Sequence, residues 1–250
     1  MKRFVLLLAV TVIAGLSARL HAEEVAWKTI GEAKGVVGMA SIGGKLFACT
    51  ADKNLQVCDP ASATVEWKTI GGAPGPVVAM GVVDGKFCAS LNARAGGRFL
   101  KRDAVETSAD WQDDGHAWCL VGMAGAAGKI FALVDTKEAG SEATIMAREA
   151  VATPEVLAKL PPAQRGLDGL PWTAASIDRR PPVGALAMTE AGGKFYIATK
   201  EDKLFVGNPT KPDVKWQEIG DAPGVTVLAG SDGWLFAATK SGKLLMAKVK

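Results

Sequence analysis

The sequence predicts an all-β fold, a five-bladed β-propeller with four-stranded blades, and three recurring features predict it. Tryptophans recur at intervals of 40, 44, 61 and 44 residues, at Trp27, Trp67, Trp111, Trp172 and Trp216. A glycine follows each of them after 17 to 21 residues, at Gly44, Gly85, Gly128, Gly193 and Gly233. Five residues before each glycine stands an apolar residue: Met39, Met80, Met123, Met188 or Leu228. A repeat of about 40 to 45 residues is typical of propellers, and no unit shows the 3.6-residue apolar period of a helical solenoid.

The first unit illustrates the four expected strands. An uncharged apolar run at 36–42 is followed by the turn Gly43-Gly44, and 45–51 forms the second strand. The third strand is expected at 55–59, and the fourth alternates over 64–70 before Gly71-Gly72. Because every first strand carries glycine or alanine, and blades converge at the axis, we expect the first strands to line the axis.

The two ends of the repeat array predict how the ring closes. The segment 25–30 matches a fourth strand without a blade of its own, and the chain stops after a third strand. The N-terminal strand can therefore complete the last blade and remove the free edges. The expected blades are 36–70, 76–112, 118–174, 183–219, and 225–250 together with 25–30.

Residues 1–22 are expected to be a signal peptide, followed by a single propeller domain over 23–250. Lys2 and Arg3 precede an apolar run at 4–16, which is short for a membrane span and typical of a secretory signal. Cleavage after Ala22 would give an exported protein, periplasmic or secreted, with no membrane attachment. The alternative is an uncleaved membrane anchor.

Charge and ligand counts exclude several classes of function. Residues 1–22 hold three basic and no acidic residues, so 26 basic and 26 acidic residues remain after them. A balanced charge offers no basic footprint for nucleic acid. His116 is the only histidine beyond residue 22, which argues against a His-based metal site. No phosphate-binding or dinucleotide motif occurs. We therefore expect neither a metal nor a cofactor. We also expect the protein to be a monomer.

Blade four carries a spaced pattern of eight residues: Asp202, Lys203, Leu204, Phe205, Pro209, Trp216, Ile219 and Gly220. This pattern resembles the repeat of tachylectin-type five-bladed lectins. The resemblance covers 25–250 as a repeat plan and implies a five-bladed propeller that binds N-acetylated sugars between blades. The family places Gly-Gly-Trp and further aromatics after Ile-Gly, whereas this chain has Gly72–Val78, without an aromatic residue.

Several side chains are candidate ligand contacts. The repeat tryptophans fit packing at a blade edge better than sugar stacking, but Trp234 replaces the turn lysine of its blade and could be exposed. The column Lys45, Lys86, Lys129 and Lys194 could attract anions, or could simply discourage edge pairing. Long loops in blades two and three contribute Arg94, Arg98, Lys137 and Glu138.

An extra segment at about 151–171 in blade three has the signals of a short helix. Thr153 is the expected N-cap, Pro154 the first helical residue, and Pro161-Pro162 the stop. Such an insertion can carry function or can be tolerated drift.

Four cysteines, Cys49, Cys58, Cys88 and Cys119, could form disulfides in an exported protein. Cys49 and Cys58 are expected on adjacent strands. A two-residue turn between these strands would place the two cysteines directly opposite one another, close enough to form a disulfide, whereas a three-residue turn would offset them. Cys88 with Cys119 is a weaker pair, and buried free thiols are the alternative.

The leading expectation is a non-enzymatic, lectin-like propeller that binds a glycan, with no catalytic residues. The alternative is an extracytoplasmic protein-interaction scaffold. A third possibility is an enzyme, which would bring several carboxylates together at the mouth of the axial channel.

Overall fold

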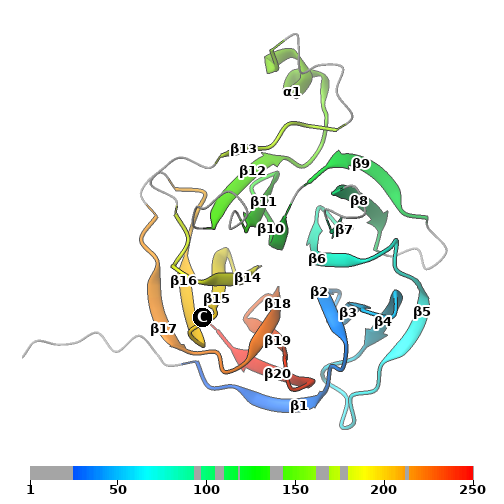
Figure 1. Cartoon of the computed structure of the whole chain (residues 1–250), viewed down its shortest axis with the longest axis vertical. Helices are drawn as coiled ribbons and strands as arrows, with labels where there is room; N and C mark the ends of the chain where they lie inside the picture. The colour runs from blue at the N-terminus through cyan, green and yellow to red at the C-terminus, as the bar shows by residue number, and fades with distance from the viewer. Residues whose placement is uncertain are drawn as a thin grey trace, which may run out of the picture.

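The computed structural model describes residues 25–92, 97–104, 110–117, 119–135, 143–161, 169–174, 180–211 and 214–249. Five four-stranded antiparallel sheets stand in a ring around a central axis (Figure 1). In each sheet the first strand lies at the axis and the fourth at the rim (Figure 1). The predicted five-bladed propeller is confirmed.

The strands of each blade follow one another in the sequence, except in the last blade. Blade one holds β2 (Val36–Ile42), β3 (Lys45–Thr50), β4 (Asn54–Cys58) and β5 (Lys68–Gly72). Blade two holds β6 (Val77–Val83), β7 (Lys86–Leu91), β8 (Arg98–Asp103) and β9 (Gln112–His116). Blade three holds β10 (Leu120–Ala126), β11 (Lys129–Val134), β12 (Thr144–Glu149) and β13 (Thr173–Ala174). Blade four holds β14 (Ala185–Ala191), β15 (Lys194–Thr199), β16 (Lys203–Gly207) and β17 (Gln217–Asp221). Blade five holds β18 (Val225–Ser231), β19 (Trp234–Thr239), β20 (Lys243–Lys248) and, from the N-terminal end, β1 (Lys28–Glu32).

The ring closes through β1, which pairs antiparallel with β20. This confirms that the N-terminal strand completes the last blade. The fourth strands begin later than the sequence predicted, at Lys68 instead of 64 in blade one. Gly71 and Gly72, expected to end the strand, instead pair with Leu55 and Asn54, and a bulge between Leu55 and Gln56 adjusts the register.

Neighbouring blades approach closely at the axis because their first strands carry small residues. A Cβ atom added to Gly122 would lie 2.5 Å from the backbone nitrogen of Met188 in the next blade. Each gap between blades holds one apolar cluster, and each cluster contains one residue of the repeating column Met39, Met80, Met123, Met188 and Leu228. The column that marked the repeat is therefore the buried seam between blades.

Four of the five repeat tryptophans join their blade to the preceding one, whereas the buried Nε1 of Trp216 has no hydrogen-bond partner among the described residues. The indole Nε1 of Trp67 donates to the Glu32 carbonyl at 2.7 Å, and Trp27 donates to Asp221 at 2.8 Å. Trp111 and Trp172 make the corresponding bonds to Gly72 and His116, at 3.4 and 3.0 Å. In each case the acceptor lies five residues after the tryptophan of the preceding blade. The structural reading of these tryptophans is confirmed.

The blade-three insertion contains α1 (Pro154–Lys159), as its cap residues predicted. The hydroxyl of Thr153 accepts a hydrogen bond from the backbone nitrogen of Val156 at 3.2 Å, and proline occupies the first turn. No residue of α1 is buried. Within the described ranges no helix is long and apolar enough to cross a membrane.

Candidate functional site

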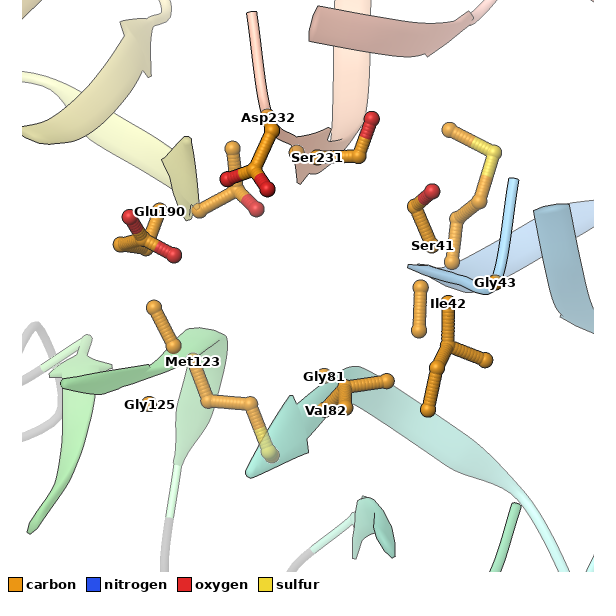
Figure 2. A pocket seen from close by; sticks show the side chains of 15 residues that line it. Ser41, Ile42, Gly43, Gly81, Val82, Met123, Gly125, Glu190, Ser231 and Asp232 are labelled. Carbon is orange, nitrogen blue, oxygen red and sulfur yellow. The ribbon is translucent and has the colours of Figure 1, made fainter. Parts of the chain in front are cut away.

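One mouth of the axial channel forms a cavity of about 260 Å³ at the ends of the first strands (Figure 2). All five blades contribute to its wall, mostly with small or apolar residues. The polar side chains are two carboxylates and three hydroxyls: Glu190, Asp232, Ser41, Thr189 and Ser231. No lysine, arginine or histidine is among the fifteen described residues that line it.

The opposite end of the channel is closed by apolar side chains. The cavity there has a volume of about 10 Å³ and is lined by residues such as Met80, Met188 and Leu228. Such a space holds at most about one water molecule. Among the residues that the structure describes, the channel therefore has room for a ligand at the mouth lined by Glu190 and Asp232.

Blade four supplies two of the five polar side chains because it departs from the repeat at two positions. One position after the methionine column, the other blades have Ala40, Gly81, Ala124 and Ala229, whereas blade four has Thr189. At the next position the others have Ser41, Val82, Gly125 and Gly230, whereas blade four has Glu190. A comparison of these two columns along the sequence is sufficient to identify both residues, because they differ from their counterparts in the other four blades.

Glu190 is a half-buried carboxylate held by the following turn. Its Oε1 accepts a hydrogen bond from the backbone nitrogen of Gly193 at 2.6 Å. Burial raises the pKa of Glu190 above its usual value; the Gly193 hydrogen bond opposes this shift, and the negative charge of Asp232 adds to it. The two acids come from the adjacent blades four and five, lie on the same side of the mouth (Figure 2), and interact electrostatically.

Asp232 comes from the first hairpin of blade five. At the matching position, the other blades have residues with positive φ, at Gly43, Asp84, Ala127 and Gly192. In blade five, Asp232 does not have a positive φ, and only the second central residue of the hairpin, Gly233, does. The chain therefore turns differently there, and the Asp232 side chain lines the mouth.

The structure brings together a carboxylate pair that the sequence reading did not find. Glu190 and Asp232 lie 42 residues apart in the sequence and meet only because β14 and the hairpin after β18 both end at the axis. A convergence of acids at the channel mouth is the feature expected of the enzyme alternative.

Trp234, the predicted binding tryptophan, is exposed and lies beside this mouth. It begins β19, its exposed fraction is 37%, and it pairs directly with Ser231, which lines the cavity. Paired residues on antiparallel strands point to the same face of the sheet. Trp234 is thus on the same face of blade five as a cavity residue.

The four column lysines begin the second strands of their blades and are exposed. They correspond to Trp234 in blade five, so four lysines and one tryptophan surround the mouth one strand out from the axis. Lys129 is paired with Glu149 at 3.1 Å.

Of the four loop residues predicted as ligand contacts, the structure describes Arg98 alone. Arg98 is exposed and forms an ion pair with Asp113 on the neighbouring strand. Arg94, Lys137 and Glu138 lie outside the described residues.

The predicted Cys49–Cys58 disulfide is not formed, and this expectation is corrected. In the β3–β4 register Cys49 pairs with Leu55, and Cys58 pairs with Leu46. The two cysteines belong to different inter-blade clusters, so their side chains lie on opposite faces of the blade. All four cysteines are free, and burial raises the pKa of Cys49 and Cys58 to about 12.

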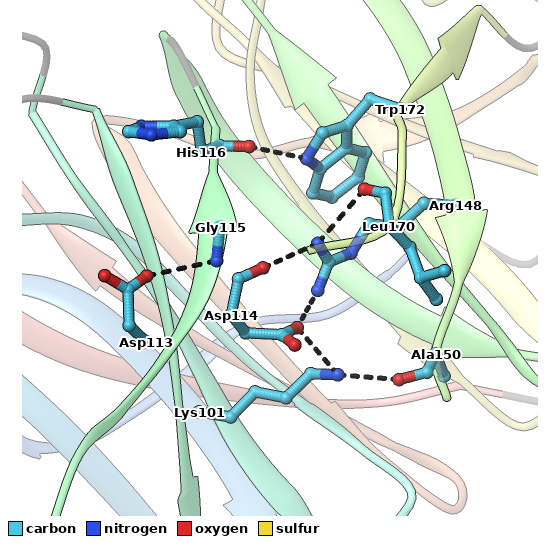
Figure 3. A network of polar contacts seen from close by, with 9 residues as sticks. All are labelled: Lys101, Asp113, Asp114, Gly115, His116, Arg148, Ala150, Leu170 and Trp172. Atoms are coloured by element: carbon cyan, nitrogen blue, oxygen red, sulfur yellow. Dashed lines mark hydrogen bonds and ion pairs between the residues drawn. The ribbon is translucent and has the colours of Figure 1, made fainter. Parts of the chain in front are cut away.

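A buried charge network between blades two and three was also missed (Figure 3). Arg148 is 3% exposed, forms an ion pair with Asp114, and stacks 4.4 Å from the ring centre of Phe99 and 5.1 Å from that of Trp172. Lys101 shares the same carboxylate at 2.8 Å. Burial lowers the pKa of Arg148 to about 10. This network joins the two blades and is not part of the axial cavity.

The sequence signal for this network is again a column of the repeat. Opposite the second residue of each second strand, blades two and three carry Arg102 and Arg148, whereas the other blades carry Cys58, Gly207 and Ala247. These arginines fill the space beside the repeat tryptophan of their own blade; in blade four Trp216 itself occupies that space over Gly207.

Comparisons with known proteins bear on the fold. No protein-family model matches the chain, and no curated protein matches it in sequence. Among solved structures, an aldose sugar dehydrogenase from Streptomyces coelicolor in its PQQ-bound form is similar, with a TM-score of 0.54 and 12% identity. The match covers 91% of this chain and 99% of that one. A glutaminyl cyclase from Myxococcus xanthus is similar with a TM-score of 0.56 and 12% identity, covering 91% and 97% of the two chains.

These likenesses correct one expectation. Both similar proteins are enzymes, so the expectation that this chain is not an enzyme is contradicted. At 12% identity the likeness extends to the fold and not to the activity. Beyond the five-bladed fold, none of these matches supports the tachylectin-type resemblance. The chain is a five-bladed β-propeller, similar in fold to a sugar dehydrogenase and a glutaminyl cyclase.

Proposed function

We propose that this protein binds a carbohydrate at the axial mouth, through Glu190 and Asp232. The observation that carries the proposal is the composition of the cavity: two carboxylates and three hydroxyls in a wall of otherwise small and apolar residues. Such a set matches the hydroxyl groups of a sugar, since carboxylates accept from them and hydroxyls both donate and accept. The negative charge disfavours acidic sugars and phosphates.

The cavity suits one sugar ring better than an oligosaccharide. Pockets for drug-sized ligands have volumes of about 300 to 1,000 Å³, and this cavity has about 260 Å³. The exposed ring of Trp234 at the rim offers a stacking surface for a second unit. A hexose of about 12 heavy atoms at about 0.3 kcal/mol per atom gives about 4 kcal/mol, a Kd of about 1 mM.

A glycan array that displays sugars at high density would detect so weak an interaction through avidity. We expect saturable binding to one sugar class that is competed by the free monosaccharide. The double variant Glu190→Gln, Asp232→Asn should lose the signal. Asp84→Asn is a matched control, because Asp84 occupies the same hairpin position in blade two but is not part of the cavity. Binding by the double variant would contradict the proposal.

A second candidate function is hydrolysis of a glycosidic bond in the same cavity. The observation that favours it is the raised pKa of Glu190 beside Asp232, because glycosidases pair a protonated acid with an ionised carboxylate. The test is release of 4-nitrophenol from a panel of 4-nitrophenyl glycosides, with Glu190→Gln as the control. Sugar binding without release would leave binding as the function.

We also propose that the protein is exported, on the basis of residues 1–22. N-terminal sequencing of the protein from an exporting host should begin at Glu23; an intact Met1 would contradict this.

A blank glycan array with folded protein would favour an extracytoplasmic protein partner. The blade-three insertion is the surface to test first, because Val151 and Leu157 are exposed there.

A further inference from the structure

We propose that the axial mouth selects a sugar carrying a free, protonated amine over the neutral and the N-acetylated forms of the same sugar. This inference rests on the proposed function and names the ligand class of that site. It differs from the preference for N-acetylated sugars, bound between blades, that the tachylectin-type resemblance implies.

The first step is the unbalanced charge of the cavity. Glu190 and Asp232 lie together in its wall, and no positively charged side chain is among its described lining residues. The nearest sequence candidates, Lys194 and the other column lysines, begin the second strands and do not line it. Glu190 is half-buried and Asp232 is exposed at the mouth. Two carboxylates at one mouth repel one another, and a cation between them relieves that repulsion.

The second step is the hydrogen-bonding capacity that the protein leaves open. One oxygen of Glu190 accepts from Gly193, at 2.6 Å. Within the described part of the chain, the Asp232 carboxylate has neither a hydrogen bond nor an ion pair. An ammonium group has three N–H donors and no acceptor, so it can satisfy both acids at once.

The hydroxyl groups that line the mouth also point to a ligand, independently of the two acids. Thr189 is 7% exposed and lines the cavity, and its hydroxyl has no hydrogen-bond partner among the residues that the structure describes. Buried hydroxyls are normally hydrogen-bonded. The partner of the Thr189 hydroxyl is thus expected from a ligand at this mouth, and a sugar supplies hydroxyls beside its amine. The hydroxyl of Ser231, which is partly exposed, also has no hydrogen-bond partner among the described residues.

The N-acetylated form of the sugar lacks the positively charged ammonium group that the two acids would bind. Acetylation removes the positive charge and replaces it with an amide that has one N–H and a carbonyl acceptor. That carbonyl would face carboxylates without a proton between them. It also adds bulk in a cavity of about 260 Å³.

Isothermal titration calorimetry with D-glucosamine, D-glucose and N-acetyl-D-glucosamine tests the inference. At about pH 6 the amine is protonated and ordinary carboxylates are ionised. We expect D-glucosamine to bind at least about tenfold more tightly than either other sugar, a difference of about 1.4 kcal/mol. Asp232→Asn should abolish the preference, Thr189→Ala should weaken all three sugars alike, and Asp84→Asn should leave all three unchanged.

The outcomes separate this inference from the proposed function. Equal binding of D-glucosamine and D-glucose would overturn the amine preference and leave carbohydrate binding in place. Tighter binding of the N-acetylated sugar would also overturn it. A titration with calcium chloride that displaces D-glucosamine by binding at Asp232 would assign the acids to a metal ion. If none of the three sugars binds to protein whose thermal unfolding transition shows that it is folded, the proposed function itself is overturned.

Discussion

Replacing Gly122 with alanine tests the close approach of blades at the axis. A Cβ atom there would lie 2.5 Å from the backbone nitrogen of Met188, 3.1 Å from its Cβ and 3.2 Å from its Cα. Ordinary contact begins at about 3.4 Å, so β10 and β14 would have to separate by about 0.9 Å. The backbone nitrogen of a paired strand cannot turn aside as a flexible side chain can. The strain must therefore spread through the ring.

The expected magnitude follows from this geometry. Overpacking a filled interior costs about 1 to 3 kcal/mol, and contact with backbone places Gly122→Ala at the upper end. Loss of glycine freedom in the unfolded chain returns about 0.5 kcal/mol. For a chain of this size about 1 kcal/mol changes Tm by about 2 to 4 °C. We expect Tm to fall by about 5 to 10 °C.

Gly71→Ala is the matched control for differential scanning calorimetry. Gly71 is also a strand glycine without positive φ, but its added Cβ would meet only the Arg102 guanidinium, at 3.8 Å. We expect this variant to match the unmodified protein or to exceed it slightly in Tm. Because Glu190 lies two residues after Met188, Gly122→Ala should also weaken ligand binding at the mouth. Equal Tm values for the two variants would refute the close packing of first strands.

Three further predictions concern charges and thiols. Asp114→Asn should destabilise the protein by about 3 to 5 kcal/mol in urea unfolding, because the buried Arg148 and the partly buried Lys101 lose their carboxylate. Arg148→Met should cost less, about 2 kcal/mol, because Asp114 keeps Lys101, and the reverse order would contradict the network. Glu190→Gln should raise Tm at pH 7. A carboxyl whose folded pKa is raised loses its contribution to stability as pH rises above about 4.5, so the gain should vanish below pH 4. A gain that is the same at both pH values would argue against the raised pKa. A thiol reagent at pH 8 should label at most Cys119 quickly in the folded protein and all four cysteines after unfolding, since burial raises the pKa of Cys49 and Cys58 to about 12 and that of Cys88 to about 11. Fewer than four thiols after unfolding would show a disulfide.

The sequence determined the architecture because a propeller is a repetition in one dimension. Each blade obeys the same local rules, so the tryptophan, glycine and methionine columns fixed the blade number, the axial strand and the closure by the N-terminal strand. Strand ends were less predictable. At Gly71 and Gly72 the glycines continue the strand in extended conformation, and only pairing with β4 distinguishes this from a turn.

The tertiary structure alone decided which side chains meet. Glu190 and Asp232 belong to different blades and different repeat positions, and they converge only where five first strands end around one axis. Cys49 and Cys58 separate because a shift in strand register moves a side chain to the other face. Arg148 of blade three forms an ion pair with Asp114 of blade two, and no local sequence pattern predicts this contact between blades. Local periodicity specifies the blades, whereas contacts between blades depend on register and ring closure, and the candidate site is built from such contacts.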